Sequence, residues 1–229
     1  MKLFIIPFAG GMSSTYLSWK DKLKKCEVVP ITLKGREERI SEALYTSFDE
    51  AVADIKDKII RHLDEEDDDF ILFGHSMGAF LAYEVYYALK KEYISPEIIF
   101  ISGRKPPVLG NDTKPVYRYK LNELKEEMIS KGGMDGKFFE SDELVDLFVP
   151  IIRADYKILY DYKFKEHKMN INSKVVVLNG RDDTATKEEM LQWNKLTEEE
   201  INYYEIPGRH FFLMESQEEV LNIIEDEIG

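Results

Sequence analysis

The sequence predicts an α/β protein, in which a mostly parallel, twisted sheet is flanked by helices. Apolar runs rich in β-branched and aromatic residues alternate with stretches of helical periodicity, which is the pattern of βαβ units. Several of these runs end in turns that carry polar residues. Because parallel sheets bind ligands beyond the carboxyl ends of their strands, these turns are where a functional site is expected.

The expected strands are short and are separated for the most part by helical patterns, such as Ala79–Lys91. They lie at Leu3–Ile6, Glu27–Leu33, Phe70–Gly74, Ile98–Ser102, Val175–Asn179 and Tyr203–Ile206. Between Gly103 and Ser173 the alternation breaks, over a length that is too great for a simple connection. This stretch holds amphipathic pieces at Leu121–Ile129 and 144–152, so we expect a helical lid inserted at about residues 104–172 of one domain, 1–229.

Composition fits one globular domain of 229 residues with a net charge of −13, which excludes a general nucleic-acid binder and argues against anionic membranes. No stretch approaches the ~20 apolar residues of a membrane span, and no signal peptide precedes the first strand. We therefore expect a cytoplasmic monomer. Cys26 is the sole cysteine, so neither an intramolecular disulfide nor a cysteine-based metal site is expected, and no metal or other cofactor is predicted.

The turn after the third expected strand holds a serine between two glycines, at Gly74-His75-Ser76-Met77-Gly78. Small residues at these positions let a sharp strand-to-helix turn close and present the serine hydroxyl to a substrate. A turn of this kind also occurs for packing alone. We interpret it as a nucleophile elbow, with Ser76 as the nucleophile, because it lies between a strand and a helix.

A serine hydroxyl is a weak nucleophile and needs a histidine base, for which the sequence offers four histidines. His62 and His75 precede Ser76, and His167 lies in a polar stretch that resembles a loop. His210 follows a strand-like run and a Pro-Gly turn, in the chain order Ser, Asp or Glu, His that this chemistry shows in α/β folds. We predict His210 as the base, the alternative being a histidine that only packs beside the apolar run 211–214.

The carboxylate that orients this base is expected in the loop Gly180-Arg181-Asp182-Asp183, directly after a strand. From there a side chain can reach the imidazole across the carboxyl edge of the sheet. We choose Asp182 because it is nearer the strand end, and Asp183 is the neighbouring alternative. Either residue could instead be a solvated turn aspartate. In this scheme His210 accepts the Ser76 proton during attack on a carbonyl, and water later releases the acyl group.

The oxyanion formed in that attack requires two backbone N–H donors. One is expected at Met77, the residue after the nucleophile. The other is expected in the loop Pro7–Gly11 after the first strand, where we favour Phe8, with Ala9 close behind. The glycines of this loop allow the backbone to approach a ligand, although they could also only turn the chain.

Five segments together resemble one family, the type II thioesterases. They are Pro7–Gly11, Gly74–Gly78, Arg153–Tyr156, Asn179–Asp183 and Gly208–Phe212. These proteins are stand-alone enzymes of the α/β-hydrolase fold that accompany non-ribosomal peptide and polyketide synthases. The resemblance spans nearly the whole chain, and the Pro-Phe-Ala-Gly-Gly and Arg-Ala-Asp-Tyr segments are narrower signals than the elbow. Arg209 departs from the family, which often has glycine there, and is expected to alter the site entrance.

This resemblance implies a triad of Ser76, Asp182 and His210 and hydrolysis of wrong or stalled acyl groups. The substrate is implied to be carried on the phosphopantetheine of an acyl or peptidyl carrier protein, which binds transiently. Two alternatives stay open: a general carboxylesterase that acts on small free esters, and a non-catalytic binding module. The second is disfavoured, because a binding module does not need all three residue types in order.

The lid is expected to cover the acyl chain, with apolar side chains that adapt to several shapes. Including one residue of the first loop, the candidates are Ala9, Met128, Met134, Phe138, Phe139 and Phe148. The alternative for each is ordinary packing of the lid helices. Arg153 and Asp155 are expected to pair structurally, with Asp155 as a reserve candidate for the triad acid.

Carrier proteins are usually acidic, so a chain of net charge −13 needs a local basic patch to bind one. The basic residues that cluster before and within the lid are Lys105, Lys114, Arg118, Lys120, Lys125, Lys131 and Lys137. We call these residues the lid lysine cluster and expect them to form the docking face.

Overall fold

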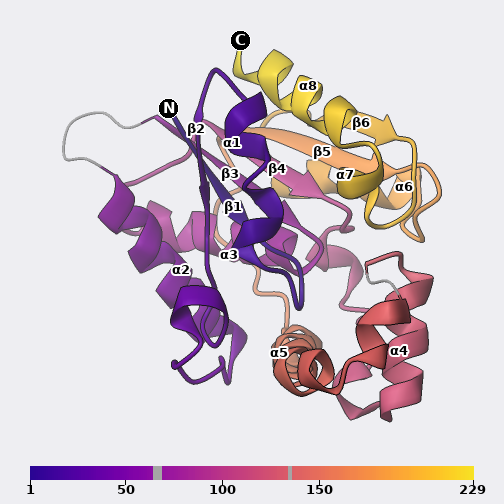
Figure 1. The fold of residues 1–229 in the computed structure, drawn as a ribbon. Coiled ribbons are helices and arrows are strands. Elements are labelled where there is room, and N and C mark those ends of the chain that lie inside the picture. The colour runs from indigo at the N-terminus through magenta and orange to yellow at the C-terminus, as the bar shows by residue number, and fades with distance from the viewer. Residues whose placement is uncertain (64–68, 134–135) are drawn as a thin grey trace.

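A computed structural model describes residues 1–63, 69–133 and 136–229 of the chain (Figure 1). The described residues form a six-stranded sheet in the order β2-β1-β3-β4-β5-β6, and every neighbouring pair is parallel. The strands are β1 (Lys2–Ile6), β2 (Glu27–Pro30), β3 (Phe70–His75), β4 (Ile98–Ser102), β5 (Lys174–Gly180) and β6 (Asn202–Ile206). The predicted parallel sheet is therefore confirmed.

The second strand is shorter than predicted, because it ends at Pro30 and not at Leu33. Ile31 N–H still donates to the Ile5 carbonyl at 2.8 Å, but the chain then leaves the sheet. Gly35 lies in a turn with a φ of 75°, which few other residues adopt. Ile31 and Leu33, the apolar residues that extended the strand pattern, are buried outside the strand.

Helices connect and cover the strands, as the alternating pattern predicts. The α-helices are α1 (Trp19–Lys22), α2 (Phe48–His62), α3 (Met77–Lys90), α4 (Leu121–Ser130), α5 (Asp142–Asp161), α6 (Lys187–Met190), α7 (Phe212–Glu215) and α8 (Gln217–Ile228). Short 3-10 helices lie at η1 (Ser13–Tyr16), η2 (Glu37–Arg39), η3 (Pro107–Leu109), η4 (Val116–Arg118), η5 (Gly136–Glu140) and η6 (Leu191–Leu196). None of the helices within the described ranges is long and apolar enough to cross a membrane.

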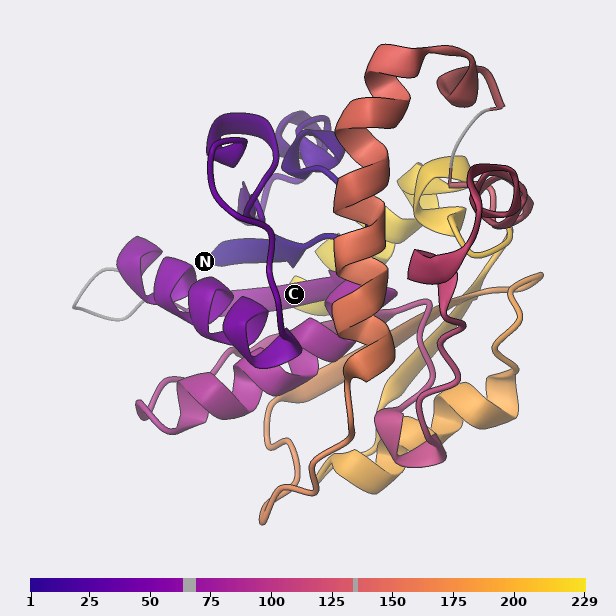
Figure 2. The same ribbon diagram turned by 90° about the horizontal axis from the view of Figure 1, so that it is seen from below.

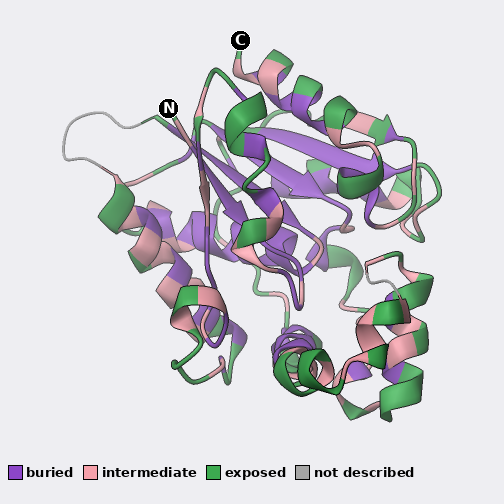
Figure 3. Ribbon diagram, viewed as in Figure 1, coloured by how far each residue is buried: buried purple, intermediate pink, exposed green. Residues whose placement is uncertain are grey.

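Both faces of the sheet are buried, since alternate side chains of each strand point to opposite sides. On one face, Phe4 and Leu72 pack in a cluster with α2 and α3. On the other, Ile5 and Phe73 pack in a second cluster with residues of α1 and α8. Figure 3 shows the strands as a buried layer between helices whose outer surfaces are exposed.

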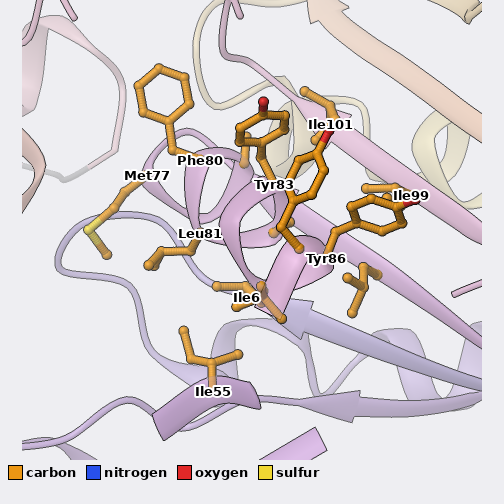
Figure 4. Packing of buried hydrophobic residues seen from close by; sticks show 14 of the residues in the cluster. Ile6, Ile55, Met77, Phe80, Leu81, Tyr83, Tyr86, Ile99 and Ile101 are labelled. Carbon is orange, nitrogen blue, oxygen red and sulfur yellow. The ribbon is translucent and has the colours of Figure 1, made fainter. Parts of the chain in front are cut away.

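Helix α3, which follows the elbow, is buried along most of its length. Figure 4 shows side chains of α3 between the sheet and helix α2, with Leu81 toward Ile6 and Ile55, and Phe80 and Ile99 belong to the same buried cluster. A helix that is apolar on most sides must lie in the protein interior. The beginning of α3 is therefore held firmly against the sheet.

The segment between β4 and β5 contains α4 and α5, which lie beyond the carboxyl ends of the strands (Figures 1 and 2). Figure 2 shows α5 as a long helix that crosses this edge, with α4 beside it. Val116, Leu124 and Met128 form a small core there with Ile152 and Tyr156 of α5. We call residues 104–172 the lid, whose assignment as an insertion in one domain stays a prediction.

Candidate active site

The turn at Ser76 has the strained geometry of a nucleophile elbow. Ser76 has φ 56° and ψ −111°, a conformation that is unusual for a residue with a side chain. The two glycines are required, since a Cβ atom on Gly74 would overlap the Gly78 carbonyl oxygen. A Cβ on Gly78 would overlap the Ile6 carbonyl oxygen of β1. The Ser76 N–H donates to the Ser102 carbonyl at 2.8 Å, which anchors the turn to β4.

Ser76, His210 and Asp183 form a hydrogen-bonded row at the carboxyl edge of the sheet. The His210 Nε2 atom lies 2.9 Å from Ser76 Oγ, and His210 Nδ1 lies 2.9 Å from Asp183 Oδ2. An ionised carboxylate only accepts hydrogen bonds, so Nδ1 carries the hydrogen and Nε2 is free to accept the serine proton. The predicted pairing of Ser76 with His210 is therefore present in the geometry.

The choice of Asp182 as the acid is wrong, because the structure places Asp183 against the imidazole. The chain turns sharply after β5, with Asp182 N–H bonded to the Gly208 carbonyl and Asp183 N–H bonded to the Gly180 carbonyl. This turn leaves the Asp182 side chain exposed, whereas the Asp183 side chain is 3% exposed. Proximity to the strand end does not identify the acid, because side chains of neighbouring residues in a tight turn point in different directions.

Asp183 is held as a carboxylate by its surroundings. Burial alone would raise its pKa, but hydrogen bonds and charge from His210, together with bonds from Thr184, lower the pKa below its usual value. Thr184 N–H donates to Asp183 Oδ1 at 2.6 Å, so each carboxylate oxygen has a donor. Thr184 was missed by the sequence reasoning, although a threonine after two turn aspartates is a signal for such a local bond.

His75 lies directly behind the row and is fully buried. Its ring is 5.1 Å from the His210 ring, and Nδ1 lies 2.9 Å from Ser102 Oγ. Burial, with a smaller contribution from the charge of His210, holds the His75 pKa well below its usual value. Because Gly103 has a φ of 60° and a Cβ there would lie 2.6 Å from His75 Cε1, the glycine lets β4 end against this ring. His75 is thus a neutral, buried neighbour of His210.

The two predicted oxyanion donors lie on elements that meet at this edge. Met77 is the first residue of α3, where backbone N–H groups have no partner within the helix. Phe8 lies in the loop after β1, and its ring contacts the rings of Phe211 and His75 at 4.8 and 6.1 Å between centroids. Their role as donors stays a prediction.

A cleft of about 560 Å³ opens over Ser76 and His210. Its walls come from the loop after β1, from the lid, from the loop after β5 and from Arg209. Basic and acidic side chains line it in equal number, and Tyr156 and Leu159 of α5 contribute apolar surface. Arg209 lies at the wall beside His210, as expected of a residue that shapes the entrance.

The predicted acyl groove differs from this cleft. Ala9 lines the cleft, but Met128 is buried in the lid's own core, and Phe139 and Phe148 pack against that core. Phe138 contacts the rings of both phenylalanines at 5.1 and 5.4 Å. Met128 is buried, whereas the three phenylalanines are half-buried and pack on one another and on the lid core. Met134 lies outside the described residues.

The expected pairing of Arg153 with Asp155 is wrong. Arg153 donates to the carbonyls of Tyr117 and Tyr119 at 2.8 and 2.7 Å, whereas Asp155 binds Arg36. Successive residues of a helix point about 100° apart, so residues two apart do not face each other. Asp155 is committed to this bond and contacts neither Ser76 nor His210, which excludes it as the triad acid.

The lid lysine cluster is partly neutralised by acidic neighbours. Lys114 and Lys131 both pair with Glu127, at 3.1 and 3.4 Å, and Lys105 pairs with Glu189 at 3.0 Å. The Lys114 side chain is 63% exposed, so it is accessible to a protein partner. The docking role of this cluster stays a prediction.

The parallel sheet with a nucleophile elbow after β3 and the acid and histidine after β5 and β6 defines an α/β-hydrolase fold. Residues 1–228 match the model of the thioesterase domain family. The chain therefore belongs to this family and is a thioesterase.

Relatives and solved structures agree with this membership. A Brevibacillus parabrevis protein named linear gramicidin dehydrogenase LgrE is 30% identical over 228 residues, covering 97% of this chain and 86% of its own. The human medium-chain S-acyl fatty acid synthase thioesterase is 32% identical, with 96% and 83% covered. The type II thioesterase BorB from the borrelidin biosynthetic cluster has a TM-score of 0.89 at 27% identity, covering 100% of this chain and 92% of its own.

Proposed function

We propose that this thioesterase removes acyl groups from the phosphopantetheine thiol of carrier proteins in non-ribosomal peptide or polyketide synthesis. The observation that carries the proposal is the hydrogen-bonded row of Ser76, His210 and Asp183 at the foot of the cleft. Similarity to LgrE and BorB, which are named after gramicidin and borrelidin biosynthesis, supports the class of pathway. Aberrant or stalled acyl groups are the proposed substrates.

In the proposed reaction, Ser76 Oγ attacks the thioester carbonyl while its proton moves to His210 Nε2. The N–H groups of Met77 and Phe8 stabilise the oxyanion of the tetrahedral intermediate. Collapse breaks the C–S bond, and the thiol of the carrier arm leaves with the proton from His210. His210 then deprotonates a water molecule that attacks the acyl-serine. Collapse of this second intermediate breaks the bond between the acyl carbon and Ser76 Oγ, Ser76 regains its proton from His210, and the acyl group leaves as the free acid. Asp183 holds the imidazole in the required tautomer throughout.

A redox reaction, which the name of LgrE suggests for that relative, finds no support in this chain. A dinucleotide site needs a Gly-x-Gly-x-x-Gly turn between the first strand and a helix. The corresponding turn here reads Pro7-Phe8-Ala9-Gly10-Gly11, and it leads toward the proposed oxyanion site. The elbow at Ser76 supports acyl transfer instead.

The proposal is tested by comparing one acyl group on three carriers: a holo carrier protein, free pantetheine and a nitrophenyl ester. We expect kcat/KM to be highest for the carrier protein, because the protein partner adds binding surface. Equal or greater kcat/KM for the free ester would instead support the general carboxylesterase. Ser76→Ala is the control for catalysis, with an expected loss of ~10⁶-fold in kcat and no adduct with a serine-reactive phosphonate.

Docking of the carrier protein on the lid lysine cluster is tested separately. Charge reversal at Lys114, Arg118 and Lys120 should raise KM for the carrier-bound substrate at low salt much more than KM for the free ester. Unchanged cleavage of carrier-bound acyl groups would remove the cluster from the proposal. The predicted monomer and the predicted cytoplasmic location are checked by light scattering of the purified protein and by cell fractionation.

A further inference from the structure

A fully buried ion pair connects the lid to the body of the protein. Arg36, in the loop after β2, is 0% exposed, and Asp155 of α5 is 1% exposed. Their side chains form two parallel hydrogen bonds, Nη1 to Oδ2 at 2.9 Å and Nη2 to Oδ1 at 2.8 Å. The two residues are 119 positions apart in the sequence.

The same pair holds the loop after β1. Asp155 Oδ2 accepts a hydrogen bond from the Gly10 N–H at 2.8 Å, and Arg36 Nη1 donates to the Gly11 carbonyl at 3.0 Å. The Gly11 N–H in turn donates to the Phe8 carbonyl at 2.8 Å, which closes the turn. Two and three residues after Phe8, the Gly10 N–H and the Gly11 carbonyl are thus each bonded to a charged side chain.

This loop also packs directly on α5. Gly10 has a φ of 77°, and a Cβ atom there would lie 2.8 Å from Cγ1 of Ile152. One and two turns further along, Tyr156 and Leu159 of the same helix line the cleft. Helix α5 therefore contacts both the substrate cleft and the loop that carries Phe8.

A buried ion pair of this kind adds little to the stability of a fold. The free-energy cost of removing two charges from water is about as large as the gain from their attraction. An apolar pair of similar volume would fill the same space. What the charges add is a directed bond to each of two peptide groups, Gly10 and Gly11. The pair thus fixes the orientation of this loop more than it stabilises the fold.

We infer that Arg36 and Asp155 are positioning residues that set the Phe8 N–H as an oxyanion donor and make this donor depend on the docking of α5. The inference rests on the proposed function for the role of Phe8. When α5 is seated, the loop after β1 is locked and the oxyanion site is complete. Displacement of α5 breaks the bond to Gly10 and releases the loop.

The test uses an Arg36→Met, Asp155→Leu double variant, which replaces the charges by apolar groups of similar volume. We expect kcat to fall ~10²-fold, as for a displaced oxyanion donor, while KM changes less than about twofold. The rate of adduct formation with a phosphonate should fall in parallel, because the phosphonyl oxygen occupies the same site. The Tm should stay within a few degrees of the parent value.

The matched control is Asp54→Asn in the nearby Arg39–Asp54 pair. That pair is also doubly hydrogen-bonded, at 2.7 and 2.9 Å, but Arg39 bonds the Thr32 carbonyl and not the loop after β1. Asp54→Asn should therefore leave kcat within about twofold. Should the double variant fail to fold, Asp155→Asn, which keeps the shape and one acceptor, is expected to lower kcat ~10-fold at unchanged KM.

A folded double variant, or a folded Asp155→Asn variant, that keeps kcat within twofold would overturn the inference. All rates are measured on a nitrophenyl ester as well as on a carrier-bound thioester, since both pass through an oxyanion. If the parent enzyme hydrolyses only the ester, the carrier-directed function is refuted. The effect of the variants on ester hydrolysis would still decide whether Arg36 and Asp155 position the oxyanion donor. Parallel loss of kcat and Tm in every variant would assign the pair to stability, against the inference.

Discussion

Replacement of Asp183 by asparagine tests the hydrogen-bonded row most directly. Thr184 N–H donates to Asp183 Oδ1 at 2.6 Å, so that position must keep an acceptor. An asparagine would therefore place its oxygen toward Thr184 and its NH₂ group toward His210 Nδ1. A donor at this point forces Nδ1 to accept and moves the imidazole hydrogen to Nε2. The histidine would then present a hydrogen to Ser76 and could not take its proton.

A wrong tautomer of this kind costs ~10⁴-fold in kcat in a Ser-His-Asp protease, which corresponds to about 5 kcal/mol in the activation barrier. We expect a loss of this size for Asp183→Asn, because its carboxylate has the same two-sided arrangement. KM should change little, since the residue does not contact the bound acyl group in this scheme. Asp182→Asn should stay within about twofold of the parent, as the Asp182 side chain is exposed and its N–H bond to Gly208 is kept.

The assay is steady-state hydrolysis of a carrier-bound acyl thioester by both variants, together with the Tm of each. The comparison is well matched, because the two substitutions are neighbours and make the same chemical change. A loss of ~10⁴-fold in Asp182→Asn with an active Asp183→Asn would refute the geometric assignment. Near-parent activity in both variants would mean that no carboxylate from this loop orients His210.

Gly78→Ala should lower the free energy of unfolding by about 3 kcal/mol and the Tm by roughly 10 °C, because the new Cβ atom would overlap a carbonyl oxygen of β1. Gly136→Ala, where a Cβ atom meets no close contact, should lower the free energy of unfolding by less than about 1 kcal/mol. Burial holds the His75 pKa well below its usual value, so unfolding takes up a proton below about pH 6.5. The free energy of unfolding, measured by urea titration, should therefore fall by at most ~1.4 kcal/mol for each unit that the pH drops below about 6.5. His75→Asn should make this dependence on pH weaker. Arg153→Met should speed amide exchange at residues 117–119, because Arg153 binds the carbonyls of Tyr117 and Tyr119.

Much of the fold could be predicted because its signals are local. Strands β1, β3, β4 and β5 are buried and largely apolar runs, and the turns that carry Ser76 and Asp183 follow β3 and β5. Strand β6, which precedes His210, is mostly half-buried or exposed and is recognised by its β-rich composition. The elbow at Ser76 requires glycines at fixed spacing, and the order of the serine, acid and histidine is set by the topology. The triad elements could therefore be placed on the correct loops before any coordinates were known.

The errors concern contacts that the local sequence does not encode. Asp182 and Asp183 are equivalent in pattern, and only the bond from Asp182 N–H to Gly208, on the loop that carries His210, turns Asp183 inward. Asp155 was expected to pair with the nearby Arg153, but its partner Arg36 is far away in sequence. Helical periodicity correctly indicated that Ile151 and Ile152 face a core, but Leu144 and Leu147 of the same pattern are exposed. The pattern does not say which apolar residues of the lid another helix covers.

The division of the site between sheet and lid has a consequence for how substrate choice and rate are controlled. Ser76, Asp183 and His210 lie in the loops that follow β3, β5 and β6, outside the lid. Helix α5 contributes Tyr156 to the cleft wall and Asp155 to the loop that carries Phe8. Substitutions at the first position should therefore act mainly on KM and acyl preference, and those at the second on kcat. If the lid only covered the substrate, substitutions at Tyr156 and Asp155 would not act separately, one on KM and acyl preference and the other on kcat.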